Sequence, residues 1–385
     1  ALTSCQSMTW DIFCSVIDNC GDIGVTWRLA RQLSDEHAIP VRLWVDDLPA
    51  FQHIRPEIVP ALPTQHLAGV EIRHWTTPLP AAEPGEVVIE ALACHLPEEF
   101  IARMAARQSA PAWLNLEYLS AEDWVAGVHG LPSPHPRLPL TKHFFMPGYA
   151  ANSGGLTRER WLTSRRDAFQ ADAAARTAFL ANLGLPVPQA GELLVSLFSY
   201  ENQALPSLLQ AWAAGGEAVR ILLPVGRALP EIAAWFGQTA PAAGAVWRRG
   251  ALTLHILPML DQDAYDRLLW ACDLNFVRGE DSFVRAQFAA RPLVWQTYVQ
   301  DDGAHFAKLE AFLALYCTGM DAQLAELTRT LWRAWNHETE MTTLWPPLRK
   351  ALPALSAHAR AWDAQLAAHT DLATNLLNFC RKWLK

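Results

Sequence analysis

Residues 10–24, W-D-I-F-C-S-V-I-D-N-C-G-D-I-G, contain the pattern that decides the fold. The stretch begins with a short apolar run, as expected for a strand buried in a parallel sheet. A loop with two glycines follows, and then Val25, Leu29 and Leu33 recur at helical spacing before Pro40. The stretch therefore predicts a strand, a loop and a helix, which is the first part of a β-α-β unit.

The same alternation continues along the chain. Further strands are predicted at residues 41–45, 70–74, 87–89, 112–116, 193–198, 219–223, 252–257, 274–277 and 292–295. Helices are predicted at residues 97–107, 167–183, 204–214, 263–272 and 283–289. Residues 131–140 contain four prolines and predict a loop. Strands and helices that alternate at this spacing predict an α/β fold with parallel sheets covered by helices.

The domain organisation follows from length and from one proline-containing stretch. At about 150 residues per domain, a chain of this length fits two domains. Residues 185–191 are interpreted as the linker between them. The predicted domains are residues 1–184 and 185–353, followed by a helical tail at residues 354–385.

Composition excludes several classes of protein. The chain is 51% hydrophobic and only 18% charged, which excludes wholesale disorder. Its net charge of -8 excludes a global positive field for nucleic acid, although not a local basic groove. No apolar run is long enough to span a membrane, and the first residues do not read as a signal peptide. Seven cysteines without a C-x-x-C pair favour reduced thiols in the cytoplasm over disulfides or a zinc site.

The loop after the first strand carries two carboxylates, Asp18 and Asp22, and a G-x-x-G spacing. Carboxylates compete with phosphate for the free amides of a helix start, so this loop suits a proton or a cationic group better. The simpler explanation is that Asp22 caps the helix and Asp18 stabilises a turn, and the local sequence alone favours it.

A second loop, R-G-E-D-S-F at residues 278–283, follows a predicted strand in the second half. Arg278, Ser282 and the helix amides could bind a diphosphate, while Glu280 and Asp281 could accept hydrogen bonds from sugar hydroxyls. An N-capped helix beside a surface arginine explains the same residues equally well.

Weaker candidates also follow predicted strands or begin helices. Tyr265 could stack on a nucleobase whose edge bonds Gln262, although an aromatic residue at a helix start more often serves packing. Phe198 and Tyr200 follow the first strand of the second half. Glu117 follows a strand of the first half, near the mouth of the expected cleft.

Several stretches, taken in this order, resemble the EarP family of bacterial arginine rhamnosyltransferases that act on elongation factor P. They are I-F-C-S-V-I-D-N-C-G-D-I-G at 12–24, W-R-L-A-R at 27–31, N-L-E-Y-L-S-A-E at 115–122, S-G-G-L at 153–156 and V-R-G-E-D-S-F-V-R-A-Q at 277–287. The resemblance implies a GT-B glycosyltransferase with two Rossmann-like domains facing a cleft. The final 60 or so residues carry no matching motif.

The resemblance also implies the chemistry. The expected donor is dTDP-β-L-rhamnose, the acceptor is one arginine of elongation factor P, and the transfer inverts the anomeric carbon. No metal or other cofactor is expected. In this family the N-terminal domain meets the acceptor protein and the C-terminal domain holds the nucleotide sugar.

Residue roles come from the same resemblance. Asp22 is expected to be the general base. Asp18 is a further catalytic candidate and is expected on the acceptor side together with Asn19, Gly21 and Glu117. The expected donor-binding residues are Phe198, Tyr200, Gln262, Tyr265, Arg278, Glu280, Asp281 and Ser282, and Glu280 is a second catalytic candidate. The sequence departs from the family pattern at Tyr265, where phenylalanine is expected, and at Cys20, where a bulkier residue is expected.

Three alternatives stay open. The chain could be a GT-B transferase for another sugar or a small-molecule acceptor. It could be an NAD-dependent oxidoreductase, although the missing G-x-G-x-x-G argues against that. It could also bind elongation factor P without modifying it.

Overall fold

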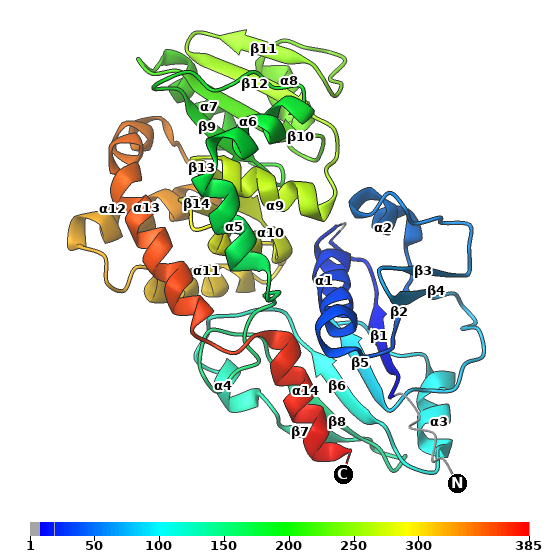
Figure 1. Ribbon diagram of the computed structural model, residues 1–385. Coiled ribbons are helices and arrows are strands. Elements are labelled where there is room, and N and C mark those ends of the chain that lie inside the picture. Colours follow the sequence, from blue (N-terminus) through cyan, green and yellow to red (C-terminus); the bar gives the residue numbers. More distant parts are fainter. Residues whose placement is uncertain (1–7, 19, 385) are drawn as a thin grey trace. The chain divides into compact units, whose positions relative to one another are not determined.

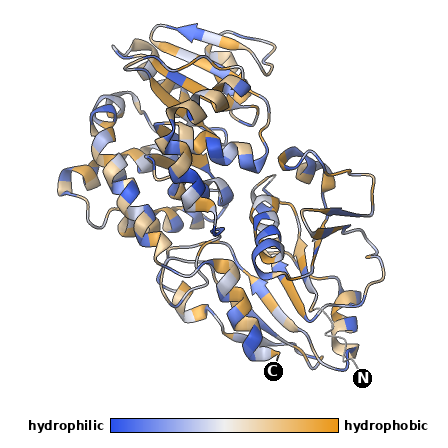
Figure 2. Cartoon of the chain, in the orientation of Figure 1, coloured by the Kyte–Doolittle hydropathy of each residue, from blue (hydrophilic) through white to orange (hydrophobic). Residues whose placement is uncertain are grey.

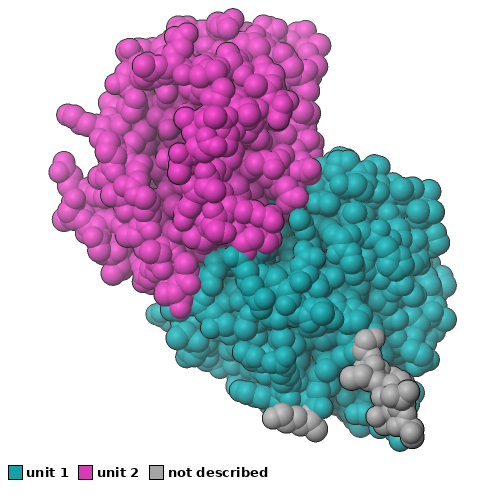
Figure 3. Space-filling view, viewed as in Figure 1, with its two compact units in different colours: residues 1–160, 369–385 teal, residues 161–368 magenta. Residues whose placement is uncertain are grey.

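The computed structural model describes residues 8–18 and 20–384, which fold into two compact units (Figures 1 and 3). Unit 1 combines Ala1–Arg160 with His369–Lys385, and unit 2 is Trp161–Ala368. These bounds differ from the predicted domain bounds at both ends of unit 2.

Unit 1 is built on an eight-stranded sheet with the order β3-β4-β2-β1-β5-β6-β8-β7. The six inner strands are parallel, whereas β3 and β7 pair antiparallel at the edges. The strands are β1 (Trp10–Cys14), β2 (Val41–Val45), β3 (Thr64–Leu67), β4 (Val70–His74), β5 (Val87–Ala91), β6 (Ala112–Leu116), β7 (Pro132–Pro134) and β8 (Thr141–Phe145). The helices are α1 (Cys20–His37), α2 (Leu48–Ile54), α3 (Glu98–Ala106), α4 (Val125–Val128) and α14 (Leu372–Trp383).

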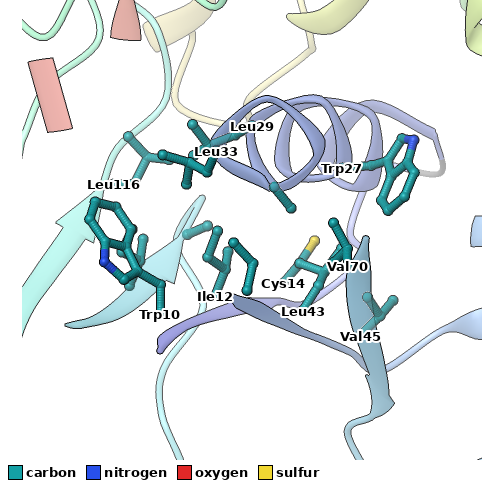
Figure 4. Packing of buried hydrophobic residues seen from close by; sticks show 14 of the residues in the cluster. Trp10, Ile12, Cys14, Trp27, Leu29, Leu33, Leu43, Val45, Val70 and Leu116 are labelled. Atoms are coloured by element: carbon teal, nitrogen blue, oxygen red, sulfur yellow. The ribbon is translucent and has the colours of Figure 1, made fainter. Parts of the chain in front are cut away.

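The central strands β1, β5 and β6 are buried along their whole length, which explains their apolar runs in the sequence. Figure 2 shows the hydropathy of each residue along the chain. On one face, Leu29 and Leu33 of α1 pack in one cluster with Ile12 of β1 (Figure 4). On the other face, Phe13 stacks on Trp44 with ring centroids 5.3 Å apart. The first strand is therefore packed on both of its faces.

The C-terminal helix α14 belongs to unit 1. Leu372 and Leu376 lie in the same apolar cluster as β1 and α1. The Leu372 amide donates to the Leu156 carbonyl at 2.9 Å. Gly155 has φ +81°, and a Cβ there would lie 2.6 Å from the Thr370 carbonyl oxygen. The S-G-G-L motif is therefore the place where the returning chain docks on unit 1.

Unit 2 is built on a six-stranded sheet with the order β11-β12-β10-β9-β13-β14, in which only β11 is antiparallel. Its strands are β9 (Leu193–Leu197), β10 (Val219–Pro224), β11 (Val246–Arg249), β12 (Leu252–Leu257), β13 (Leu274–Arg278) and β14 (Leu293–Gln296). Its helices are α5 (Leu162–Ala171), α6 (Ala173–Asn182), α7 (Leu205–Ala214), α8 (Leu229–Trp235), α9 (Gln262–Ala271), α10 (Asp281–Phe288), α11 (Ala304–Tyr316), α12 (Ala322–Asn336), the short 3-10 helix η1 (Thr342–Leu344) and α13 (Trp345–Ala367).

Two predicted helices are each divided in the structure. The helix expected at 167–183 is α5 and α6, separated at Asp172, whose side chain accepts the Ala174 amide and caps α6. The tail expected at 354–385 is α13 and α14, separated before Asp371, which caps α14 by accepting from Thr374. In each case an aspartate caps the start of the second helix.

Two expected loops also differ. Residues 131–140 contain the short strand β7, because proline is tolerated in an edge strand whose N–H groups need no partner. The expected linker at 185–191 lies within unit 2, where Leu185 is only 5% exposed and packs with Leu194 and Leu222. The chain instead passes between the units at residues 160–161 and 368–369.

Among the described residues, no helix is long and apolar enough to cross a membrane.

Candidate active site

The aspartate pair follows β1, and Asp22 lies in the first turn of α1. Asp22 is 2% exposed. Its Oδ2 accepts the backbone N–H groups of Ile17 and Asp18, each at 2.8 Å. The Tyr118 hydroxyl donates to its Oδ1 at 3.0 Å. Asp22 therefore accepts hydrogen bonds from the residues before its own helix, as a capping residue would. Its buried carboxylate lies beyond the carboxyl end of the central strand β1.

Burial raises the pKa of the Asp22 carboxyl above its ordinary value, because the charged form loses solvation. The hydrogen bonds from Asp18, Ile17 and Tyr118 act in the opposite direction, and the Asp18 charge adds to the increase. The net result is a carboxylate that is more basic than that of an exposed aspartate.

The other acceptor-side candidates in unit 1 lie on two loops. Asp18 is half-buried, and a Cβ on Gly21 would lie 2.9 Å from its Oδ2, so the carboxylate occupies the space that this glycine leaves. Glu117 follows β6 and accepts a 2.6 Å hydrogen bond from the Asn115 side chain. The prediction for Asn19 lies outside the described residues.

Tyr118 contacts the candidate site through Asp22, and sequence reasoning missed it. It follows β6, whereas Asp22 follows β1, and β5 lies between these strands. Its only signal was its place beside Glu117 directly after a predicted strand.

The donor-side candidates of unit 2 gather at the carboxyl ends of β9 and β13, which are neighbours in the sheet. The Arg278 guanidinium lies 4.3 Å from the Phe198 ring centroid and 4.5 Å from that of Tyr200. Arg278 is 7% exposed. Tyr265 of α9 adds a third ring, 5.5 Å from Phe198. The structure thus brings together an arginine and three aromatic rings that are separated in the sequence.

The turn from β13 into α10 uses part of the predicted donor motif for its own geometry. The Ser282 hydroxyl donates to the Arg278 carbonyl at 2.5 Å and accepts the Arg278 amide at 3.1 Å. The Gln262 side chain donates to Asp281 Oδ2 at 3.2 Å. Glu280 is half-buried at the N-cap of α10, where its side chain makes no capping hydrogen bond. The α9 and α10 starts are therefore tied to each other.

A buried ion pair braces the same two helices. Arg285 of α10 binds Asp266 of α9 through Nε at 3.1 Å and Nη2 at 2.8 Å. Their side chains are 1% and 2% exposed. Since Gln262 and Tyr265 are on α9 and Asp281 on α10, this pair sets how the two groups of donor candidates lie relative to each other.

Arg227 is a second residue that sequence reasoning missed. It follows β10, its guanidinium lies 4.9 Å from the Tyr200 ring centroid, and it pairs with Glu201 at 2.7 Å. The hydrogen bond with Arg227 lowers the pKa of the Glu201 carboxyl. Tyr200 therefore lies close to two guanidinium groups, of which that of Arg227 is paired with Glu201.

Metal ligands were not expected, and the part of the chain that is described contains no group of three His, Cys, Asp or Glu residues placed to hold a metal ion. That the reaction needs no metal stays a prediction.

A family model described as elongation factor P rhamnosyltransferase EarP matches residues 10–381. The chain belongs to the EarP family. It is 52% identical to a protein-arginine rhamnosyltransferase of Pseudomonas putida, over 98% of this chain and 99% of that protein. It is 50% identical to one of Pseudomonas aeruginosa, over 98% and 100% of the two chains.

One solved structure agrees with this membership, and a second shows the fold. A structure that describes EarP-mediated arginine glycosylation of translation elongation factor EF-P has 39% identity and a TM-score of 0.71, covering 98% of this chain and all of that one. A UDP-glucosyltransferase from Polygonum tinctorium shares the fold at 9% identity, with a TM-score of 0.53 and all of both chains covered. The predicted GT-B fold and the resemblance to the EarP family are confirmed, and the chain is a glycosyltransferase.

Proposed function

We propose that this EarP family member transfers L-rhamnose from dTDP-β-L-rhamnose to an arginine of elongation factor P, with inversion at the anomeric carbon. The family and the names of its curated relatives support the rhamnosyl group and the arginine acceptor. The observation that carries the proposal is the buried Asp22 carboxylate, which two amides and a tyrosine hydroxyl hold in place.

The acceptor side needs a base. A guanidinium group has a pKa above about 12 and is a poor nucleophile while it keeps all its protons. As the C–N bond forms, the attacking nitrogen becomes acidic and must lose one proton. Burial raises the pKa of Asp22 above that of an ordinary aspartate, so the difference between its pKa and that of the guanidinium is smaller. Asp18, Asn19, Gly21 and Glu117 are the proposed surroundings of the guanidinium.

The donor side needs a cation. The diphosphate of dTDP takes the electron pair of the breaking glycosidic bond, and fixed positive charge stabilises it as it leaves. Arg278 is suited to this because two aromatic rings hold its guanidinium in place. Gln262 and Tyr265 would bind the thymine base, and Glu280 and Asp281 would accept hydrogen bonds from the sugar hydroxyls. An acceptor that serves translation implies a cytoplasmic enzyme.

The test combines the purified chain, elongation factor P and dTDP-β-L-rhamnose, followed by intact-mass measurement of the acceptor. A gain of one deoxyhexose is expected, and the anomeric proton and carbon signals of the product should report inversion. A mass gain with UDP-glucose in place of dTDP-rhamnose would redirect the proposal to another sugar. A stable complex without any mass change would replace it with the binding-protein alternative.

The acceptor variant provides the matching control. With the target arginine replaced by lysine, modification should be lost, because a lysine presents one point charge instead of a planar group with five donors. Efficient glycosylation of the lysine would contradict an arginine-specific site.

Arg278→Ala should weaken dTDP binding by roughly 10-fold or more in calorimetry, because hydrogen bonds to charged groups are worth about 1.5–3 kcal/mol. Arg249→Ala is a matched control. Arg249 also stacks on two rings, 4.1 Å from Trp235 and 5.7 Å from Phe236, but it belongs to β11 at the opposite edge of the sheet from β13 and β14. Equal dTDP affinity in the Arg278 variant and the wild type would remove Arg278 from the donor site.

A further inference from the structure

The hydroxyl of Tyr118 contacts the proposed base Asp22, although the two residues follow different strands of unit 1. Tyr118 is half-buried on the loop after β6, and its hydroxyl reaches Asp22 Oδ1 at 3.0 Å. This hydrogen bond therefore joins two residues that are 96 positions apart in the sequence.

The hydrogen bonds of Asp22 identify which oxygen can take a proton. An ionised carboxylate offers about four acceptor positions, two on each oxygen. Both positions of Oδ2 are filled by the Ile17 and Asp18 amides, and one position of Oδ1 is filled by Tyr118. Within the described part of the chain, the acceptor position that is left lies on Oδ1.

We propose that Tyr118 is a positioning residue for the transfer, which fixes the Asp22 carboxylate so that Oδ1 takes the proton of the acceptor guanidinium. The inference rests on the proposed function and deepens it. Asp22 is the group that touches the substrate, and Tyr118 acts through it.

The step balances without a further reagent. A guanidinium nitrogen forms a bond to the anomeric carbon while the bond from that carbon to the diphosphate oxygen breaks, and the electron pair leaves with dTDP. The proton of the attacking nitrogen moves to Oδ1. Tyr118 keeps its own proton throughout, and its hydroxyl remains a donor to the same oxygen.

The electrostatic setting of Asp22 gives the inference a measurable consequence. Burial and the charge of Asp18 raise the pKa of Asp22, while the Tyr118 hydrogen bond lowers it. The Cys14 thiol also interacts with this carboxylate, and burial raises its pKa, so it stays neutral. Removal of the Tyr118 hydroxyl removes a hydrogen bond that lowers the pKa of Asp22, so this pKa should rise further.

The experiment is the pH dependence of turnover in the wild type and in Tyr118→Phe. The base must be ionised, so activity falls as the pH drops through the pKa of Asp22. In Tyr118→Phe this acidic limb should move to higher pH by up to about one unit. Turnover at neutral pH should fall by roughly 10-fold, while dTDP affinity stays the same. Tyr316→Phe, the same change on α11 of unit 2, should leave the limb in place.

The outcomes separate the inference from the proposed function. If the wild type transfers no deoxyhexose, the proposed function fails. If the wild type is active and the acidic limb of Tyr118→Phe does not move, the inference is overturned. This holds even if the turnover of the variant falls by the same factor at every pH. A second measurement does not need activity: the carboxyl carbon of Asp22, assigned with Asp22→Asn, should titrate at higher pH by NMR in Tyr118→Phe. An unchanged titration would also overturn it.

Discussion

Asp22→Asn is expected to lower turnover by at least about 100-fold while dTDP affinity stays at the wild-type value. The amide oxygen can keep the two hydrogen bonds from Ile17 and Asp18, and the amide nitrogen can donate to the Tyr118 oxygen instead of accepting from it. The loop geometry is thus retained and only the basic site is lost. Turnover is measured from the mass gain of elongation factor P, and affinity by calorimetry with dTDP.

The stability of the same variant provides its control. The folded-state pKa of Asp22 is raised above its unfolded value, so ionisation of this group opposes folding once the pH exceeds the unfolded pKa. At pH 7, Asp22→Asn should therefore unfold at the same temperature as the wild type or higher. Asp22→Ala should lose about 1–3 kcal/mol, because it leaves buried amides without an acceptor.

A stable Asp22→Asn variant that turns over like the wild type would disprove the base assignment. Glu280, the second catalytic candidate, would then be tested as Glu280→Gln in the same assay.

Asp266→Ala is expected to lower the free energy of unfolding by about 3–5 kcal/mol, because the Arg285 guanidinium would be left charged and buried. Urea unfolding followed by fluorescence of the chain's tryptophans measures the loss. Since the pair joins α9 to α10, the affinity for dTDP should fall as well.

Two comparisons show whether burial causes the loss. Arg333 and Glu310 form a pair of the same bidentate geometry, at 2.8 Å for both contacts, but both side chains are nearly half exposed. Glu310→Ala should cost at most about 1 kcal/mol. The double variant Asp266→Leu/Arg285→Met should recover most of the lost stability, because a buried ion pair can be replaced by apolar side chains of similar volume. A loss in Asp266→Ala no larger than in Glu310→Ala would contradict this account.

Most of the parallel strands could be predicted from sequence because strands buried on both faces are continuous apolar runs, whereas the partly exposed parallel strand β8 was missed. The strands at 41–45, 70–74, 112–116 and 252–257 have the predicted bounds. The edge strands β3 and β11 were missed, because a strand with one exposed face carries few apolar residues. The ends of the long helices were also misplaced, since they depend on capping aspartates whose geometry appears only after folding.

The sequence indicated where candidate site residues lie along the chain, but not which of them contact one another. The rule that ligands bind after the carboxyl ends of strands led to both loops, at Asp22 and at Arg278. The contact between Asp22 and Tyr118 could not be predicted, because it depends on the strand order β1-β5-β6, which the sequence does not state. The stacking of Arg278 on Phe198 and Tyr200 depends in the same way on β9 and β13 being neighbours.

The docking of α14 on unit 1 sets an order of events during synthesis on the ribosome. The apolar surface that Leu372 and Leu376 cover emerges early, whereas the helix that covers it emerges after the whole of unit 2. At about 5–20 residues per second, that interval is roughly 10–40 s. Unit 2 is therefore the first to be complete, and a nascent chain that stalls before residue 369 leaves unit 1 with an uncovered apolar surface open to chaperones and to aggregation.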